Sequence, residues 1–365
     1  MKAAVLREYR TPLSIEDIDL LPPQSGEIRV RFAASGVCHS DMTRIEGARA
    51  SSLPIVLGHE ASAYVEELGP GVTGFEIGDR VVLSFIYDCG QCYFCRSGHP
   101  NLCEVGIGML RNGTMPDGTT RLRKGDEIIH HMTVSSFAEE AVLPARCATK
   151  IPDDMPMDVA ALIGCAVLTG TGAVFNAAQV RPGDSVLVIG SGGVGLNVVQ
   201  AAAIVGASTI IVSDMNPEKL KLARSFGATH VVDARSEDPV AKAKELTQGR
   251  GVDFAFEAIG HKATIQQCYD AIRSAGKAVV VGVAEAGNCC EIEAISLPFT
   301  EKTLTGSMYG GARPGLDIER LVKLYSSKRL HLDELISKTY RLDQINEAFH
   351  DLHEGRLARG LIRFE

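Results

Sequence analysis

The sequence predicts an α/β protein in which a β-rich portion precedes a doubly wound parallel sheet. Short β-branched runs separated by glycine and proline turns fill the first half, such as EIRVRFA (27–33) and RVVLSF (80–85). From about residue 185 strand patterns alternate with helical patterns, which indicates a parallel sheet with helices on both faces. A length of 365 residues favours about two domains.

The elements of the second half follow from uninterrupted apolar runs and from helical spacing. The predicted strands are SVLVIG (185–190), TIIVSD (209–214), DFAFE (253–257) and KAVVVGV (277–283). The predicted helices are 194–205, a segment beginning near Asn216, 316–326 and 343–353, and the chain ends in a strand-like LIRF.

Composition and charge restrict the class of partner. The chain is 45% hydrophobic and 22% charged, and its net charge of −8 offers no basic face for nucleic acid or for an anionic membrane. The N-terminus has no export signature, and the charge-free stretches 159–180 and 185–213 contain glycines and polar residues. We therefore expect buried segments rather than membrane spans, in a cytoplasmic protein whose ten cysteines stay reduced.

The turn between the first predicted strand and helix of the second half is rich in glycine. Its G-x-G-x-x-G pattern favours a dinucleotide site, because glycines let the backbone approach a pyrophosphate at a helix N-terminus. Asp214, 19 residues after Gly195, would bind the ribose hydroxyls of NAD and repel the 2′-phosphate of NADP, and Lys219 is near enough to reach the ribose edge. A structural turn without ligand is the alternative. The glycines are Gly190, Gly192, Gly193 and Gly195.

A second motif has the spacing C-x2-C-x2-C-x7-C. Four thiolates close a tetrahedral site and leave no position for substrate, so the motif predicts structural zinc that orders its own loop. An iron–sulfur cluster and free reduced cysteines are the alternatives. The residues are Cys89, Cys92, Cys95 and Cys103.

The stretch SGVCHSD (35–41) places a thiol, an imidazole, a hydroxyl and a carboxylate side by side. Cys38 has possible partners in His59 and Cys165, and two cysteines with one histidine leave the open fourth position of a catalytic zinc. Spacing alone does not select Cys165, because the three residues are far apart in the chain. A polar surface turn is the alternative for this stretch.

The chain resembles the zinc-dependent medium-chain alcohol dehydrogenases over essentially its whole length, most closely the branch that contains class III-type enzymes. The stretches that carry the resemblance are GVCHSD, GHE, the four-cysteine loop, GCAVLTG, GSGGVG with its downstream Asp, FEAIG and ARGLIRF. The resemblance implies a GroES-like catalytic domain (1–166 and 309–365, with the structural-zinc loop 89–103), a Rossmann NAD-binding domain (167–308), and a homodimer or homotetramer.

The resemblance also implies metal ligands and catalytic groups. Cys38, His59 and Cys165 would bind the catalytic zinc, and Ser40 would begin a proton relay. Asp41 would hold His59 in one tautomer, although it could instead cap a helix starting near Met42. Glu60 is expected to approach the metal during ligand exchange.

Further residues are implied to contact coenzyme and substrate. Thr169 and Val194 would line the nicotinamide, with packing alone as their alternative role. His39 and Arg359 would reach the pyrophosphate, and Phe85 would form part of an apolar wall of the substrate pocket.

Two departures from the family pattern affect the expected substrate and proton route. Thr43 stands where many relatives carry a histidine, so the proton would leave through water, the ribose or His39. Ile107 and Arg49 stand near positions where the class III branch carries an arginine and an acidic residue. We therefore expect a hydrophobic alcohol or aldehyde rather than the formaldehyde–glutathione adduct.

The leading hypothesis is thus an NAD-dependent alcohol dehydrogenase with one catalytic and one structural zinc per chain. Two alternatives stay open. One is an NADP-dependent aldehyde or polyol reductase of the same superfamily, against which Asp214 argues. The other is a non-catalytic NADH-binding sensor of redox state, which would bind the nucleotide without turnover.

Overall fold

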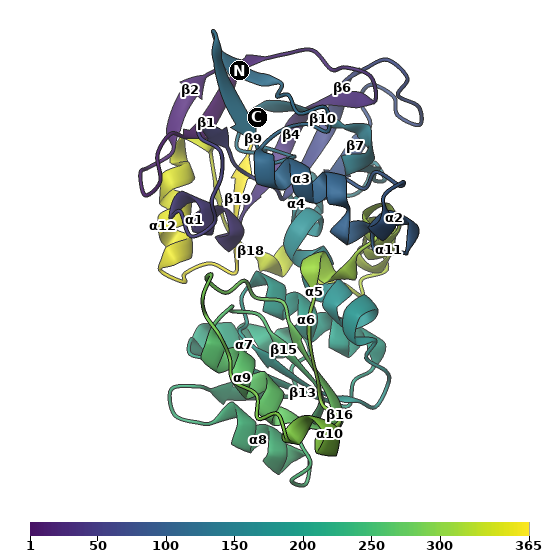
Figure 1. Cartoon of the computed structure of the whole chain (residues 1–365), viewed down its shortest axis with the longest axis vertical. Coiled ribbons are helices and arrows are strands. Elements are labelled where there is room, and N and C mark those ends of the chain that lie inside the picture. Colours follow the sequence, from purple (N-terminus) through teal and green to yellow (C-terminus); the bar gives the residue numbers. More distant parts are fainter. Residues whose placement is uncertain (365) are drawn as a thin grey trace. The chain divides into compact units, whose positions relative to one another are not determined.

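The computed structural model describes residues 1–364, which divide into two compact units. The first comprises Met1–Cys165, Arg313–Lys328 and the chain from Leu332 onward, and the second comprises Ala166–Ala312 and Arg329–His331. The divisions lie one and four residues from the expected boundaries, and the short return of 329–331 to the second unit was not expected. The C-terminal strand β19 lies beside the early strand β4 in the first unit (Figure 1).

The first unit is built around strand β4 (Glu27–Val37), which pairs antiparallel with β6 (Ala61–Leu68), β10 (Glu140–Pro144) and β19 (Arg359–Arg363). Alternate residues of β4, Ile28, Val30 and Phe32, are fully buried, as the alternating pattern EIRVRF predicts. The sheet runs β11-β7-β6-β4-β19-β18, with β7 (Arg80–Leu83), β11 (Ala148–Lys150) and β18 (Ile336–Tyr340).

A second sheet of the first unit has the strand order β2-β1-β5-β9-β8-β3. Its strands are β1 (Lys2–Leu6), β2 (Ser14–Asp17), β3 (Asp19–Leu20), β5 (Ile55–Val56), β8 (Leu122–Lys124) and β9 (Glu127–His131). The helices of this unit are α1 (His39–Ile45), α2 (Tyr93–Arg96), α3 (Glu104–Asn112), α4 (Met157–Leu162), α11 (Pro314–Ser326) and α12 (Ile345–His353). Helix α1 directly follows β4, and β6 directly follows Glu60, so the two strands carry Cys38 and His59 at adjoining ends.

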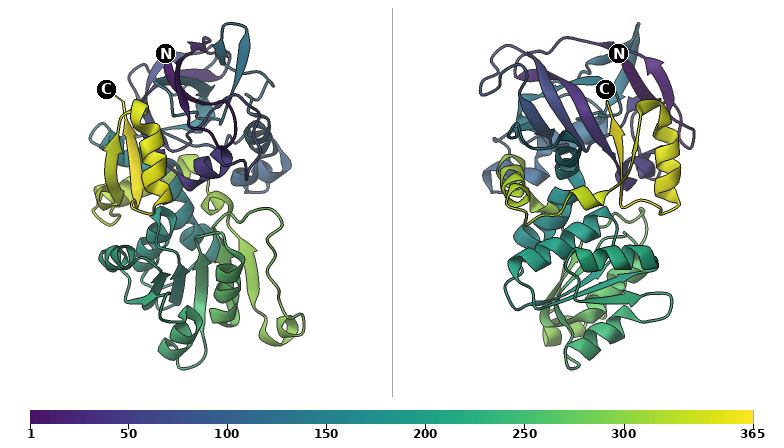
Figure 2. Two further views of the ribbon diagram at one scale, coloured as in Figure 1. Left: turned by 90° about the vertical axis from the view of Figure 1, so that its left-hand side faces the viewer. Right: turned by 180° about the vertical axis from the view of Figure 1, so that it is seen from behind.

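Parallel strands form the sheet of the second unit, in the order β14-β13-β12-β15-β16-β17. They are β12 (Ser185–Ile189), β13 (Thr209–Asp214), β14 (His230–Asp233), β15 (Val252–Glu257), β16 (Ile272–Val280) and β17 (Thr303–Gly306). The helices are α5 (Leu168–Gly172), α6 (Gly193–Val205), α7 (Pro217–Ser225), α8 (Pro239–Leu246), α9 (Lys262–Ala271) and α10 (Ser296–Thr300) (Figure 2). The strand order reverses between β12 and β15, the point where doubly wound sheets bind ligands.

The α/β class and the doubly wound sheet are confirmed, and most predicted elements are shifted by one or two residues at most. Strand β16 differs, because it begins at Ile272 and ends at Val280 instead of spanning 277–283. It ends early since the N–H groups of Val281 and Gly282 both turn to the carbonyl oxygen of Glu257. Asn216 caps α7 by accepting a hydrogen bond from the N–H of Glu218.

Within the described residues, the helical stretch Met157–Ala178 is long and apolar enough to cross a membrane. Its most apolar window is 83% buried inside the protein, as in a core helix. The stretch is interrupted by a π-helical turn at Ile163–Val167, a local widening that often accompanies functional residues, and this turn carries Cys165.

Candidate metal centres and nucleotide site

Three residues distant in the chain converge in a buried cluster of the first unit. Cys38 precedes α1, His59 follows β5, and Cys165 lies in the π-helical turn. Their ligand atoms all lie within 4.8 Å of one another, and the Cys165 sulfur is 3.3 Å from Nε2 of His59. In a tetrahedral zinc site with the usual bond lengths a sulfur and a nitrogen ligand lie about 3.5 Å apart, so the cluster has the dimensions of such a site.

Asp41 sets the orientation of the His59 ring. Its Oδ1 accepts hydrogen bonds from the N–H of Gly58 at 3.0 Å and from Nδ1 of His59 at 3.1 Å, and its side chain is fully buried. With Nδ1 donating to Asp41, Nε2 is the ring nitrogen that faces the sulfurs and is placed to bind a metal ion. The alternative role of Asp41 as a helix cap is wrong, because α1 begins at His39 and Asp41 lies inside its first turn.

The charges of the cluster favour a cation. Burial lowers the pKa of His59, but the nearby Asp41 carboxylate and Cys38 thiolate outweigh it and raise that pKa to about 10. A hydrogen bond from Cys165, opposed by burial and aided by the positive charge of Arg359, holds the pKa of Cys38 well below its ordinary value. The same hydrogen bond and burial raise the pKa of Cys165. A buried site that holds a thiolate and attracts a proton to its imidazole suits a divalent metal ion.

Glu60 and Arg359 form a buried pair beside the cluster. Glu60 is fully buried, and Nε of Arg359 lies 3.7 Å from its Oε1. The carboxylate is held tightly, since a Cβ on Gly36 would lie 2.5 Å from the same oxygen. Arg359 reaches this place because β19 pairs with β4, with Gly360 opposite Val37. Arg359, which is expected to bind the pyrophosphate, is thus already paired with Glu60 in this structure.

Phe85 and Ser40 complete the surroundings within the first unit. The Phe85 ring meets the His59 ring edge to face, with centroids 5.2 Å apart and planes at 85°, and so supplies an apolar side. Ser40 lies half-buried in the first turn of α1, and His39 beside it is exposed. Thr43 Oγ1 donates to the carbonyl oxygen of Ser40 at 3.0 Å, so its proton is already used by the backbone.

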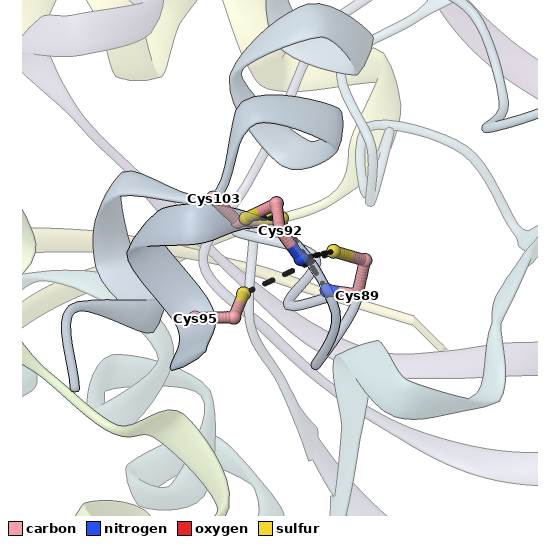
Figure 3. A group of neighbouring side chains, drawn as sticks. All are labelled: Cys89, Cys92, Cys95 and Cys103. Atoms are coloured by element: carbon pink, nitrogen blue, oxygen red, sulfur yellow. Dashed lines mark hydrogen bonds between the residues drawn. The ribbon is translucent and has the colours of Figure 1, made fainter. Parts of the chain in front are cut away.

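The four cysteines of the C-x2-C-x2-C-x7-C motif also converge. Figure 3 shows their sulfurs turned toward one another from the loop before α2, from α2 itself and from the start of α3. The sulfurs of Cys89 and Cys95 are 4.0 Å apart and those of Cys92 and Cys103 3.9 Å apart. Zinc–sulfur bonds of the usual length give a tetrahedral edge of about 3.8 Å, so the loop fits a closed four-thiolate metal site.

Backbone N–H groups prepare this loop for thiolates. The N–H groups of Cys89 and Gly106 donate to the Cys103 sulfur at 3.3 and 3.5 Å, and that of Cys92 donates to the Cys89 sulfur at 3.3 Å. Such donors stabilise negative charge on sulfur. The backbone N–H of Cys95 is the main cause that lowers the pKa of Cys92 to about 6, whereas burial raises that of Cys95 to about 12. Metal binding must therefore displace protons from the loop.

The glycine-rich turn of the second unit leaves a cradle at the start of α6. Gly190 has φ +93°, and a Cβ on Gly195 would overlap the carbonyl oxygen of Gly190, so helix and turn pack closely. A Cβ on Gly192, the residue before α6, would meet none of the described atoms within 4 Å. Space beside the free N–H groups of a 13-residue helix is where a phosphate group fits.

Asp214 is tied to this turn. Its Oδ2 accepts from the N–H and the hydroxyl of Ser191 at 2.8 and 2.9 Å, and its Oδ1 accepts from the N–H of Asn216. Lys219 lies on the first turns of the following helix, α7. The structure thus brings the carboxylate and the predicted phosphate cradle into direct contact.

Thr169 and Val194 lie where two helices of the second unit cross. A Cβ on Gly170 would lie 2.5 Å from the carbonyl oxygen of Val194, so α5 and the start of α6 touch at this point. Thr169 precedes the contact residue on α5. The two predicted coenzyme residues therefore lie on segments that pack against each other.

Two features were not anticipated from the sequence. The Glu60–Arg359 pair requires the pairing of β19 with β4, which periodicity does not reveal. The fully buried carboxylate of Glu257 is the second feature, and its sequence signal is an acidic residue at the end of the apolar run DFAFE (253–257).

Comparison with known proteins agrees with this arrangement, in which a GroES-like unit and a doubly wound unit together form the fold of a dehydrogenase. Residues 24–153 match the family model described as "Alcohol dehydrogenase GroES-like domain", and residues 193–327 match "Zinc-binding dehydrogenase". The chain belongs to the zinc-type medium-chain alcohol dehydrogenases, enzymes that interconvert alcohols with aldehydes or ketones.

Individual relatives span the whole chain. An alcohol dehydrogenase class-3 from Drosophila melanogaster is 40% identical over 373 residues, covering 100% of this chain and 97% of its own. An NDMA-dependent alcohol dehydrogenase from Amycolatopsis methanolica is 38% identical over 365 residues, with coverage of 99% and 98%. The crystal structure of benzyl alcohol dehydrogenase from Acinetobacter calcoaceticus is 35% identical, with a TM-score of 0.95 and coverage of 100% and 99%.

Removing one thiol of the four-cysteine loop should empty it of metal. We expect Cys95→Ser to lower the metal content by one ion per chain, measured by elemental analysis. It should also cost at least about 2 kcal/mol, or about 4–8 °C in melting temperature for a domain of this size. Cys289→Ser, a change at an exposed cysteine outside both clusters, is the control and should alter neither value. Unchanged metal content in Cys95→Ser would contradict a metal site in the loop.

Neutralising Asp41 should weaken the three-residue centre alone. We expect Asp41→Asn to lower metal affinity at this centre about 10–100-fold, because the amide no longer fixes the His59 tautomer. Competition with a chelator measures this, and the ion in the four-cysteine loop serves as the internal reference. Asp343→Asn, at an exposed carboxylate paired with Arg341, is the surface control. Equal retention of both ions in Asp41→Asn would refute the role of Asp41.

Proposed function

We propose that this protein is an NAD-dependent alcohol dehydrogenase that holds two zinc ions per chain. The observation that carries the proposal is the contrast between its two thiol clusters. Cys89, Cys92, Cys95 and Cys103 provide a complete tetrahedral set and suit a structural ion. Cys38, His59 and Cys165 provide three ligands and leave a position for an exchangeable oxygen.

Zinc in the three-residue centre would supply a Lewis acid for an alcohol or carbonyl oxygen, and NAD would supply the hydride acceptor. The chain's own groups would orient and deprotonate the substrate. Asp41 fixes His59 through Nδ1. Ser40, two residues after the ligand Cys38, takes the proton of the alcohol hydroxyl. Phe85 excludes water from one side of the His59 ring and forms an apolar wall for substrate.

The proton leaves by a route that does not use Thr43 as a base. The Thr43 hydroxyl donates to the Ser40 carbonyl oxygen, and a threonine hydroxyl is not basic near neutral pH. Water, the coenzyme ribose or the exposed His39 takes the proton from Ser40. Glu60 is paired with Arg359 and directly follows the ligand His59 in the chain. It would approach the metal during ligand exchange.

NAD is favoured over NADP by the carboxylate of Asp214, which would accept from the ribose hydroxyls and repel a 2′-phosphate. Gly190, Gly192, Gly193 and Gly195 would let the pyrophosphate approach the start of α6, and Lys219 would lie at the ribose edge. Thr169 and Val194 would contact the nicotinamide, whereas His39 and Arg359 would contact the pyrophosphate.

A hydrophobic alcohol or aldehyde is the proposed substrate class. Support comes from Phe85 beside His59 and from Ile107, which stands near a position where the class III branch carries an arginine. The likeness to a benzyl alcohol dehydrogenase makes benzyl alcohol a reasonable first test compound. We further propose a cytoplasmic homodimer or homotetramer whose partner is this small molecule, without nucleic acid or membrane.

Activity should depend on the three-residue centre. We expect NAD⁺ reduction with at least one of a panel of primary, secondary and aromatic alcohols, and a loss of at least about 10³-fold in kcat/KM in Cys38→Ser. Absorbance of NADH measures both, and Cys289→Ser is the matched thiol control. Full activity in Cys38→Ser would refute the catalytic assignment, and NADH binding without turnover on any alcohol would favour a redox sensor.

Coenzyme choice should follow the charge at residue 214. Asp214→Asn keeps an oxygen that can accept from Ser191 but loses the negative charge. We expect the ratio of kcat/KM for NADP to that for NAD to rise at least about tenfold. Asp233→Asn is the matched control, because Asp233 is the register partner of Asp214 on β14 and pairs with Arg235. A wild-type preference for NADP would favour the reductase alternative.

A further inference from the structure

Glu257 is a fully buried carboxylate at the carboxyl end of the parallel sheet. It is the last residue of β15, and its register partners are Ile189, the last residue of β12, and Val280, the last residue of β16. It therefore lies where the strand order reverses. Its partner Ile189 is the residue directly before Gly190, at which the glycine-rich turn begins. A charge in such a place needs specific partners to offset its burial.

The partners of Glu257 come from two loops. Its Oε1 accepts hydrogen bonds from the N–H groups of Ile259 and Gly260, at 3.1 and 2.8 Å, and from the hydroxyl of Thr264 at 2.7 Å. Its carbonyl oxygen accepts from the N–H groups of Val281 and Gly282, at 2.8 and 3.0 Å. Glu257 thus holds segment 258–264, which includes the start of α9, through its carboxylate, and loop 281–283 through its backbone carbonyl.

The two loops are also packed against each other. A Cβ on Gly282 would lie 2.6 Å from Oε2 of Glu257, and a Cβ on Gly260, whose φ is +92°, would overlap the carbonyl oxygen of Val283. Close packing without side chains at both glycines leaves little freedom for either loop once the carboxylate is in place.

The first of these loops reaches the glycine-rich turn. A Cβ on Gly190 would lie 2.6 Å from Cγ1 of Ile259, and the N–H of Ala258 donates to the carbonyl oxygen of Ile189. Ile259 and Val283 leave 53% and 55% of their surface exposed at this edge, which is unusual for large apolar side chains of two adjoining loops. A bound dinucleotide would cover them.

We propose that Glu257 is a positioning residue for the coenzyme, an inference that rests on the proposed function. Its carboxylate orders segment 258–264, against which loop 281–283 packs, before the dinucleotide binds. The charge of the acceptor strengthens each of the three hydrogen bonds to Oε1. Because the loops are already ordered, the entropy of ordering them does not weaken coenzyme binding.

The test compares Glu257→Gln with Asp253→Asn. Asp253 lies on the same strand, four residues earlier, and its carboxylate likewise accepts hydrogen bonds from the N–H and hydroxyl of Ser185 and from Nε of Arg273. It sits at the opposite end of the sheet from the proposed coenzyme. Both variants remove the charge of a hydrogen-bonded carboxylate on β15, so a loss of stability that follows from removing such a charge affects both.

We expect Glu257→Gln to raise the dissociation constant for NADH about tenfold or more, as titrated by fluorescence, with a parallel rise in the KM for NAD. Metal content and kcat at saturating NAD should not fall. Thr264→Val, which removes one donor from the same oxygen, should raise the constant by a smaller factor of about three. Asp253→Asn should leave the constant unchanged.

Two results would overturn the inference while leaving the proposed function intact. One is an unchanged dissociation constant in both Glu257→Gln and Thr264→Val, and the other is an equal rise in Asp253→Asn. A wild-type protein that binds no NADH overturns the proposed function, and with it this role for Glu257. Titration of the wild-type protein comes first and separates the two cases.

Discussion

The hydrogen bond between Asp41 and His59 is the constraint on which the three-residue centre depends. It joins the first turn of α1 to the segment between β5 and β6, and it leaves Nε2 facing two sulfurs. Burial alone would expel a carboxylate, a thiolate and an imidazole from this place, so their mutual charges must offset the cost. The raised pKa of His59 and the lowered pKa of Cys38 show that the cluster favours a positive charge beside its negative groups. A divalent cation supplies more of that charge than a proton does.

Two thiol clusters in one chain solve different problems with similar ligands. The four-cysteine loop is half-exposed and takes its thiolate-stabilising donors from its own backbone. The other cluster takes its residues from three separate segments, and the carboxylate of Asp41 orients its histidine. A local loop can close around an ion by itself, whereas an open coordination position has to be held by the surrounding fold.

Sequence patterns predicted those parts of the molecule whose interactions are local. The strand–turn–helix at Gly190–Gly195 and the four-cysteine loop were predicted from the spacing of their residues alone. The convergence of Cys38, His59 and Cys165 was inferred through family resemblance, since no periodicity relates residues so far apart. The Glu60–Arg359 pair and the segments held by Glu257 were not predicted, because they depend on which strand ends lie side by side. Asp41 shows the remaining difficulty, as the same residue type caps helices and orients histidines.

The pairing of β19 with the end of β4 has a consequence for biosynthesis. Residues 34–37 of β4 are synthesised before the main part of the second unit, Ala166–Ala312, whereas their partners 360–363 are synthesised after it. The strands of the parallel sheet, β12 to β17, are contiguous in the chain and lie between these two segments. While they are being translated, the end of β4 in the nascent first unit lacks its partner strand β19. Unpaired edges of this kind invite wrong pairing. A chain whose translation stopped before residue 359 would therefore lack the Arg359 partner of Glu60 and expose that edge, even though every thiol ligand had already been synthesised.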